Sequence, residues 1–217
     1  LIITGGEQTP AARAMLQASA VPVVQIMGEV DKPIDINVGF SHFEAGAAVA
    51  QLLLNRSYLK IGFIGARMDP RTCQRLDGFE GILSAANRLD KKRIITTQKP
   101  SSVAMGASLF RELMTTTQGN CDAVFCCNDD LALGVLHQCK KMHIDVPKQF
   151  GVCGFNDIEM AAYAEPALST VRVNRYNMGS KAMELIFEKI NPQTDEASSI
   201  SAYINTGFEL VIRQSTR

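Results

Sequence analysis

The chain has 217 residues, of which 46% are hydrophobic, so it is long enough to bury the core of one large α/β domain or of two lobes. Lysine plus arginine and aspartate plus glutamate both number 22, and no basic run breaks that balance, which argues against a nucleic-acid-binding surface within this chain. No apolar run approaches the roughly 20 residues that cross a bilayer, and no charged leader precedes an apolar segment. We therefore expect a cytoplasmic protein without membrane association.

Six cysteines do not indicate a disulfide framework here, because a chain of this length can build its own hydrophobic core. None of them has Cys-x-x-Cys spacing, and His42, His137 and His143 show no zinc-ligand spacing with them. We expect free thiols packed as small hydrophobic side chains, with no metal site and no cofactor.

Strands and helices are predicted to alternate along the chain. Residues 1–4 read as an apolar strand with no turn or cap before it, so we expect an amino-terminal truncation. Further strands are predicted at 21–26, 34–40, 60–65, 94–97, 123–127, 151–155, 170–174, 203–206 and 208–213. Helices are predicted at 10–18, 42–55, 70 to about 86, 105–114, 129 to about 139, and 176–190, and a polar loop at 192–199. This alternation indicates an α/β fold with parallel sheets.

Polar residues follow three of the apolar strands. Asn128, Asp129 and Asp130 come directly after the strand at 123–127 and before apolar residues at helical spacing. The other two strand ends carry Arg67, Asp69 and Arg71 after 61–65, and Asn156 and Asp157 after 151–155. Ligands of doubly wound folds bind outside the carboxyl ends of the strands, so these side chains are candidates for one site. The alternative for the first group is that Asn128 or Asp129 only caps the following helix.

Four segments resemble the effector-binding core of LacI/GalR-type bacterial transcriptional repressors. They are residues 38–46 (VGFSHFEAG), 127–134 (CNDDLALG), 154–171 and 209–216 (ELVIRQST). The second is shared with periplasmic sugar-binding proteins, whereas the other three together point to the repressors. Residues 65–72 (GARMDPRT) are further similar to the gluconate-utilisation repressors of that family.

The resemblance implies a two-lobed, periplasmic-binding-protein-like fold with parallel sheets and an incomplete amino-terminal lobe. The helix-turn-helix, the hinge helix and the first two strand and helix units of that lobe are not part of this sequence. The chain is expected to cross between the lobes near Phe40, at 171–173 and at 204–206. The expected lobes are residues 1–40 with 172–205, the partial amino-terminal lobe, and residues 41–171 with 206–217, the carboxyl-terminal effector-binding lobe.

Carried over position by position, the resemblance places ligand contacts on Arg75, Asn128 and Asn156, wall residues at Phe40 and Phe155, and a further contact at Arg71, one turn before Arg75. A guanidinium can grip a carboxylate in two places, although an arginine on a helix is more often a solvated charge. The amides of Asn128 and Asn156 match the hydroxyls of a polyol. Many family members have an aspartate in place of Asn156 and an aromatic ring near Ser101. Both departures favour an open-chain sugar acid.

The resemblance implies the effector-sensing domain of a LacI-type repressor, which binds a small sugar or a sugar acid such as gluconate and controls operator DNA through a headpiece outside this chain. A homodimer is the expected assembly. The alternative is a periplasmic sugar-binding protein of a transport system. A third class, an α/β enzyme acting on sugar acids, lacks its signature, because no nucleophile lies beside a base, no carboxylates pair and no phosphate loop occurs. We therefore expect no catalytic residue and no enzymatic activity.

Overall fold

A computed structural model of the chain describes residues 1–5, 8–191 and 203–217, so the predicted loop at 192–199 lies outside the described residues. Strands and helices alternate within these ranges, and the predicted α/β fold with mainly parallel sheets is confirmed. None of the helices in this part of the chain is both long and apolar enough to span a membrane.

The chain divides into two compact units, which are described separately. The small unit comprises Leu1–Ser41 and Asn174–Phe208, and the large unit comprises His42–Val173 and Glu209–Arg217. The chain therefore passes between the units three times along its sequence.

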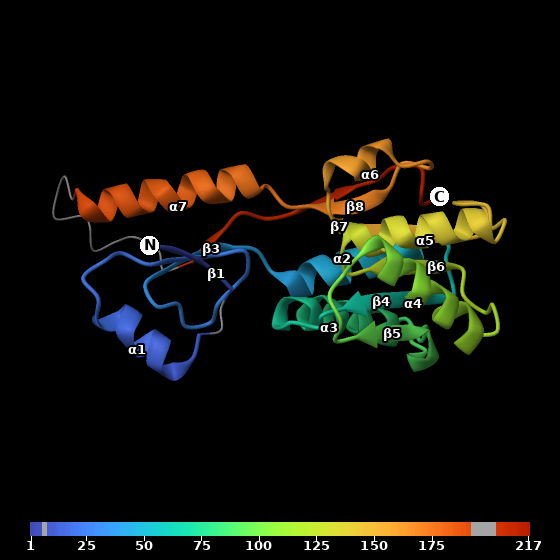
Figure 1. Ribbon diagram of the computed structural model, residues 1–217, viewed down its shortest axis with the longest axis horizontal. Coiled ribbons are helices and arrows are strands. Elements are labelled where there is room, and N and C mark those ends of the chain that lie inside the picture. Colours follow the sequence, from blue (N-terminus) through green and yellow to red (C-terminus); the bar gives the residue numbers. More distant parts are fainter. Residues whose placement is uncertain (6–7, 192–202) are drawn as a thin grey trace. The chain divides into compact units, whose positions relative to one another are not determined.

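The small unit is built on a four-stranded parallel sheet with the order β1-β2-β3-β9. Its strands are β1 (Ile2–Thr4), β2 (Val24–Ile26), β3 (Ile36–Gly39) and β9 (Tyr203–Asn205). Figure 1 shows α7 (Arg175–Ile190) along one side of this sheet and α1 (Pro10–Ala18) on the other. Thr9 caps α1, and Pro10 occupies its first turn, where a missing N–H is harmless.

The large unit is built on a six-stranded sheet with the order β10-β8-β7-β6-β4-β5, parallel except for β10. Its strands are β4 (Ile61–Ala66), β5 (Ile94–Thr97), β6 (Ala123–Cys126), β7 (Gly151–Asn156), β8 (Ser169–Arg172) and β10 (Glu209–Val211). Its helices are α2 (His42–Asn55), α3 (Pro70–Ala85), α4 (Val103–Thr116), α5 (Asp129–Lys141) and α6 (Glu159–Tyr163), with a 3-10 turn at Lys91–Arg93. The connections from β4 to β5 and from β5 to β6 run in opposite directions along the sheet. Right-handed crossovers therefore place α3 and α4 on opposite faces.

Glycines allow α2 and α3 to approach each other with their backbones almost in contact. A Cβ atom built on Gly46 of α2 would lie 2.0 Å from the backbone oxygen of Arg75 in α3. A Cβ atom on Gly78 of α3 would lie 2.0 Å from the backbone oxygen of Phe43 in α2. The close contact fixes the backbone of α3 at Arg75, because a larger residue at either glycine would push the helices apart.

We expect Gly78→Ala to lower the free energy of unfolding by about 1–3 kcal/mol, because the added methyl group overpacks the contact between α2 and α3. The matched control is Gly81→Ala in the same helix, where no atom lies within 4 Å of the added Cβ atom. At that position the better helix propensity of alanine should raise stability by about 0.5–1 kcal/mol. Urea-induced unfolding measures both variants, and equal stability of the two would show that the close approach imposes no constraint.

Asp129 anchors the start of α5 to two other segments of the large unit. Its side chain is buried, with Oδ1 accepting a hydrogen bond from Thr170 Oγ1 at 2.6 Å and Oδ2 accepting one from the Ile158 N–H at 2.9 Å. Burial raises the pKa of Asp129 above its ordinary value, and these bonds oppose the rise. This member of the predicted polar group after β6 therefore has a structural role.

Replacing Thr170 with Val should lower the free energy of unfolding by about 1–3 kcal/mol near neutral pH, because a buried carboxylate loses one of its donors. The lost bond opposes the effect of burial, so the pKa of Asp129 in the folded state should rise further. The destabilisation should therefore shrink as the pH falls and Asp129 becomes protonated. Urea titrations at about pH 7 and about pH 4.5 test this, and an equal loss at both would contradict it.

Candidate functional site

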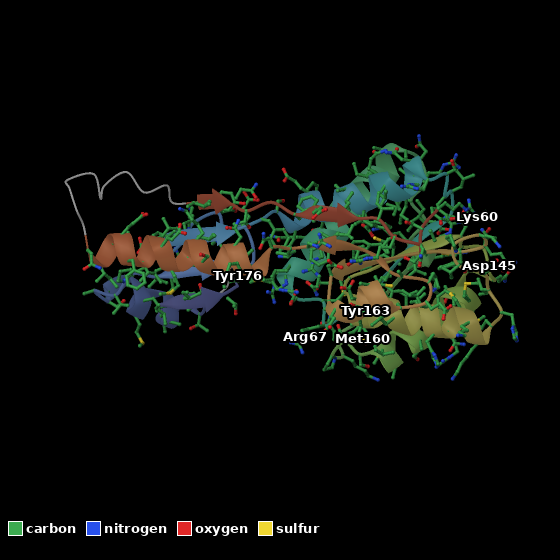
Figure 2. The ribbon with its side chains drawn as sticks, turned by 90° about the horizontal axis from the view of Figure 1, so that it is seen from above. Lys60, Arg67, Asp145, Met160, Tyr163 and Tyr176 are labelled. Atoms are coloured by element: carbon green, nitrogen blue, oxygen red, sulfur yellow. The ribbon has the colours of Figure 1, made fainter. Side chains whose placement is uncertain are left out.

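The carboxyl ends of the parallel strands form one edge of the large-unit sheet, which we call the carboxyl edge. Figure 2 shows Arg67, Met160 and Tyr163, which follow β4 and β7, toward one end of the large unit, and Lys60 and Asp145, which precede those strands, toward the other. At the carboxyl edge the chain leaves β4 and β6 for opposite faces of the sheet. Doubly wound folds bind ligands at such a switch in direction.

Arg75 reaches this edge on α3, whose start is set by the residues after β4. Asp69 caps the helix by accepting a hydrogen bond from the Thr72 N–H at 2.9 Å, and Pro70 occupies the first helical position. Burial raises the pKa of Asp69, but the Thr72 N–H and the Arg71 guanidinium outweigh burial and lower it below its ordinary value. Arg71 is half-exposed and forms an ion pair with Asp69 at 3.2 Å, so its charge is already shared with the cap.

The guanidinium of Arg75 is buried, and its direct contacts are uncharged groups. The residue is 9% exposed, its Nη1 donates to the Cys127 carbonyl oxygen at 2.6 Å, and its Nε donates to His42 Nδ1 at 3.1 Å. Its Cζ atom lies 3.7 Å from the centroid of the Phe155 ring, a cation–π arrangement. Within the described ranges, none of the ion pairs involves Arg75.

Arg75 remains charged in this environment: Asp69 and Asp129 favour its charged form from a distance, but neither forms an ion pair with it. Burial lowers its pKa to about 10, which still keeps the guanidinium protonated at neutral pH. A buried charge is unfavourable unless it is paired or well hydrogen-bonded. The bonds to His42 and Cys127 use only Nε and one hydrogen of Nη1. The other Nη1 hydrogen and the two Nη2 hydrogens remain, and an Nη1 and an Nη2 hydrogen together can bind a carboxylate in two places.

Asn128 has both halves of its amide engaged. Its Oδ1 accepts a hydrogen bond from the Leu131 N–H at 3.1 Å, so Asn128 caps α5, as the alternative to a ligand contact expected. Its Nδ2 donates to Ser101 Oγ at 2.7 Å. The second Nδ2 hydrogen, together with the Ser101 hydroxyl, can still serve a ligand hydroxyl.

Asn156 ends β7 in a backbone conformation that L-amino acids rarely adopt, with φ of 114°, and Asp157 follows with φ of 51°. Asp157 is held by Arg172, whose Nε donates to Oδ2 at 2.6 Å, and by Arg213, whose Nη2 lies 2.8 Å from Oδ1 as an ion pair without good hydrogen-bond geometry. Burial raises the pKa of Asp157, but the two arginines outweigh burial and lower it. Such strain persists only where neighbouring contacts hold it, and it concentrates at functional sites.

The two predicted wall residues belong to different units. Phe155 is fully buried in the large unit, where its ring lies against the Arg75 guanidinium. Phe40 follows β3 in the small unit, is also fully buried, and packs against Phe208 with ring centroids 6.4 Å apart.

The structure adds two residues to those predicted from the sequence. His42, the first residue of α2, accepts the hydrogen bond from Arg75, and Ser101 accepts the one from Asn128. The sequence signal for His42 is its place within residues 38–46, one of the segments that carry the resemblance. The only sequence signal for Ser101 is that many members of the family have an aromatic residue near this position.

Comparison with known proteins gives the family of the chain. Residues 50–216 match the family model described as a periplasmic binding protein-like domain. The chain is 40% identical over 217 residues to the HTH-type transcriptional regulator GntR of Pseudomonas aeruginosa and 30% identical over 194 residues to that of Escherichia coli. These matches cover 100% and 89% of this chain, which spans 62% and 58% of the two regulators.

Solved structures agree with these matches. The crystal structure of the transcription regulator GntR from Chromobacterium violaceum has a TM-score of 0.92 and 36% identity, and the match covers 99% of this chain and 77% of that one. A LacI family transcriptional regulator from Silicibacter pomeroyi has a TM-score of 0.91 and 32% identity, over 100% of this chain and 64% of its own. The chain therefore belongs to the periplasmic-binding-protein-like domain family, in the form found in LacI-family transcriptional regulators.

Proposed function

We propose that this chain is the effector-sensing domain of a LacI-family transcriptional repressor and that its effector is a sugar acid such as gluconate. In the whole protein, effector binding would control the attachment of a helix-turn-helix headpiece to operator DNA. The whole protein would act in the cytoplasm as a homodimer. The function is binding, without catalysis.

The observation that carries this proposal is the uncancelled charge of Arg75. A guanidinium that is 9% exposed, and that among the described residues donates hydrogen bonds only to a carbonyl oxygen and an imidazole nitrogen, is prepared to receive an anion. A carboxylate is the planar anion that best matches the geometry of its remaining donors. A neutral sugar would leave that charge as it is.

The rest of the proposed ligand would be a chain of hydroxyl groups. Asn128 and Ser101 offer an amide hydrogen and a hydroxyl group beside each other, and Asn156 contributes a second amide at the end of the adjacent strand. No aromatic ring stands at Ser101 to stack on a pyranose, which favours an open-chain ligand.

The relatives support regulation over the alternative role in transport. The similar proteins and structures are named as transcriptional regulators, and their identities to this chain reach 40%. The similarity of residues 65–72 to gluconate-utilisation repressors supports gluconate as the first acid to test.

We expect gluconate to stabilise the chain and glucitol, which replaces the carboxylate with a hydroxymethyl group, to stabilise it much less. A ligand at 100 times its dissociation constant adds about 2.7 kcal/mol to the free energy of unfolding. A thermal-shift series with gluconate, glucitol and other aldonates measures this difference. Equal stabilisation by glucitol and gluconate would contradict recognition of a carboxylate, and stabilisation by none of the aldonates would reject the proposed effector class.

Arg75→Gln should weaken gluconate binding about tenfold or more, because a charge-assisted hydrogen bond is worth about 1.5–3 kcal/mol. The variant should also unfold more easily, since the Cys127 carbonyl loses a charged donor, so calorimetry belongs well below its unfolding transition. Arg88→Gln is the matched control, because Arg88 is exposed and lies beyond the end of α3. Unchanged affinity in Arg75→Gln would remove Arg75 from the site.

A further inference from the structure

The side chain of His42 contacts the guanidinium of Arg75 at its Nε atom. His42 is the first residue of α2, and only 1% of its surface is exposed. Its Nδ1 is 3.1 Å from Arg75 Nε, and its ring centroid is 5.9 Å from that of Phe155, on which Arg75 also lies. The imidazole and the phenyl ring therefore fix the guanidinium from two directions.

The direction of this hydrogen bond defines the state of His42. Arginine can only donate, so Nδ1 must accept, and an imidazole nitrogen accepts only when it carries no proton. The imidazole is therefore neutral, with its proton on Nε2. Any protonated form would bring a second cation to within hydrogen-bonding distance of Arg75, where like charges repel.

A neutral acceptor at this position has a different effect on Arg75 from a carboxylate. A carboxylate would hold Nε equally well, but it would also cancel the positive charge that an anionic ligand requires. An imidazole orients the guanidinium and leaves its charge in place. His42 therefore orients Arg75 and does not neutralise its positive charge.

We infer that His42 is a positioning residue of the effector site, which aims Arg75 at the ligand carboxylate and preserves the site's selectivity for acids. The inference rests on the proposed function, because it takes Arg75 to be the residue that binds the acid. The inference goes beyond that function because it assigns the selectivity for acids to the neutral state of His42, which does not itself touch the ligand. If His42 only filled the core, the affinity for an acid would not depend on whether the residue at position 42 is neutral or negatively charged.

The test compares His42→Asn with His42→Asp, because the two replacements have the same shape and place an oxygen near the position of Nδ1. Asn keeps the acceptor neutral, whereas Asp adds a negative charge beside Arg75. We expect His42→Asn to bind gluconate with an affinity close to that of the unmodified chain. We expect His42→Asp to bind gluconate at least about tenfold more weakly than His42→Asn. This loss should occur even though an ion pair between the aspartate and Arg75 would stabilise the folded state. His137→Asn and His137→Asp, on the exposed side of α5, are the matched controls and should bind alike.

Calorimetry with gluconate and urea-induced unfolding are measured on all five proteins. Equal gluconate affinity in His42→Asn and His42→Asp would overturn the role of His42 while leaving the proposed effector intact. Absence of gluconate binding by the unmodified chain would instead reject gluconate as the effector, and this inference with it.

A second measurement keeps the inference testable if either variant fails to fold. Nitrogen-15 spectra of the unmodified chain, labelled at histidine, report the protonation of each imidazole nitrogen. We expect an unprotonated Nδ1 and a protonated Nε2 at His42, and we expect the Nδ1 signal of His42 to shift on addition of gluconate while the signals of His137 stay in place. A protonated Nδ1 at His42, or an Nδ1 signal that ignores gluconate binding, would overturn the inference.

Discussion

A permanent positive charge inside a protein is unfavourable unless other groups replace the water that it has lost. Around Arg75 that replacement comes from the carbonyl of Cys127, the imidazole of His42 and the face of the Phe155 ring. These groups come from the end of β6, the start of α2 and the end of β7, so the position of Arg75 depends on the packing of three separate elements. A fourth element, α3 itself, is held in position by the close contact between Gly46 and the backbone of Arg75. None of the groups that directly contact the guanidinium is charged.

The carboxyl edge also holds the residues at which the chain enters and leaves the large unit. His42 is the first residue after one crossing, and Arg172 and Glu209 adjoin the other two. Arg172 binds Glu209 at 3.1 Å and also binds Asp157, the neighbour of Asn156. A ligand bound between Arg75 and Asn156 would therefore act directly beside all three connections. In the proposed sensing function, a ligand bound to the large unit could therefore affect the segments that connect it to the small unit.

Local sequence signals predict the elements of this fold well, whereas the site depends on contacts that those signals do not contain. The helix expected near 10–18 has these bounds in the structure, where Thr9 caps it, and the capping alternative for Asn128 is observed at the start of α5. The bond between Arg75 and His42 joins residues 33 positions apart, and only tertiary packing brings them together. Asp129 occupies the same kind of strand end as Asn128, yet its partner Thr170 makes it an anchor. Residue type alone does not separate these two roles.

The central claim, that the charge of Arg75 is held for a ligand carboxylate, is tested most directly by a crystal structure of the chain grown with gluconate. We expect the carboxylate to lie on the Nη atoms of Arg75, with the guanidinium still against Phe155 and still bonded to Cys127 and His42. A structure in which the hydroxyl chain of gluconate faces Arg75, or in which Arg75 has turned away to pair with a protein carboxylate, would contradict it.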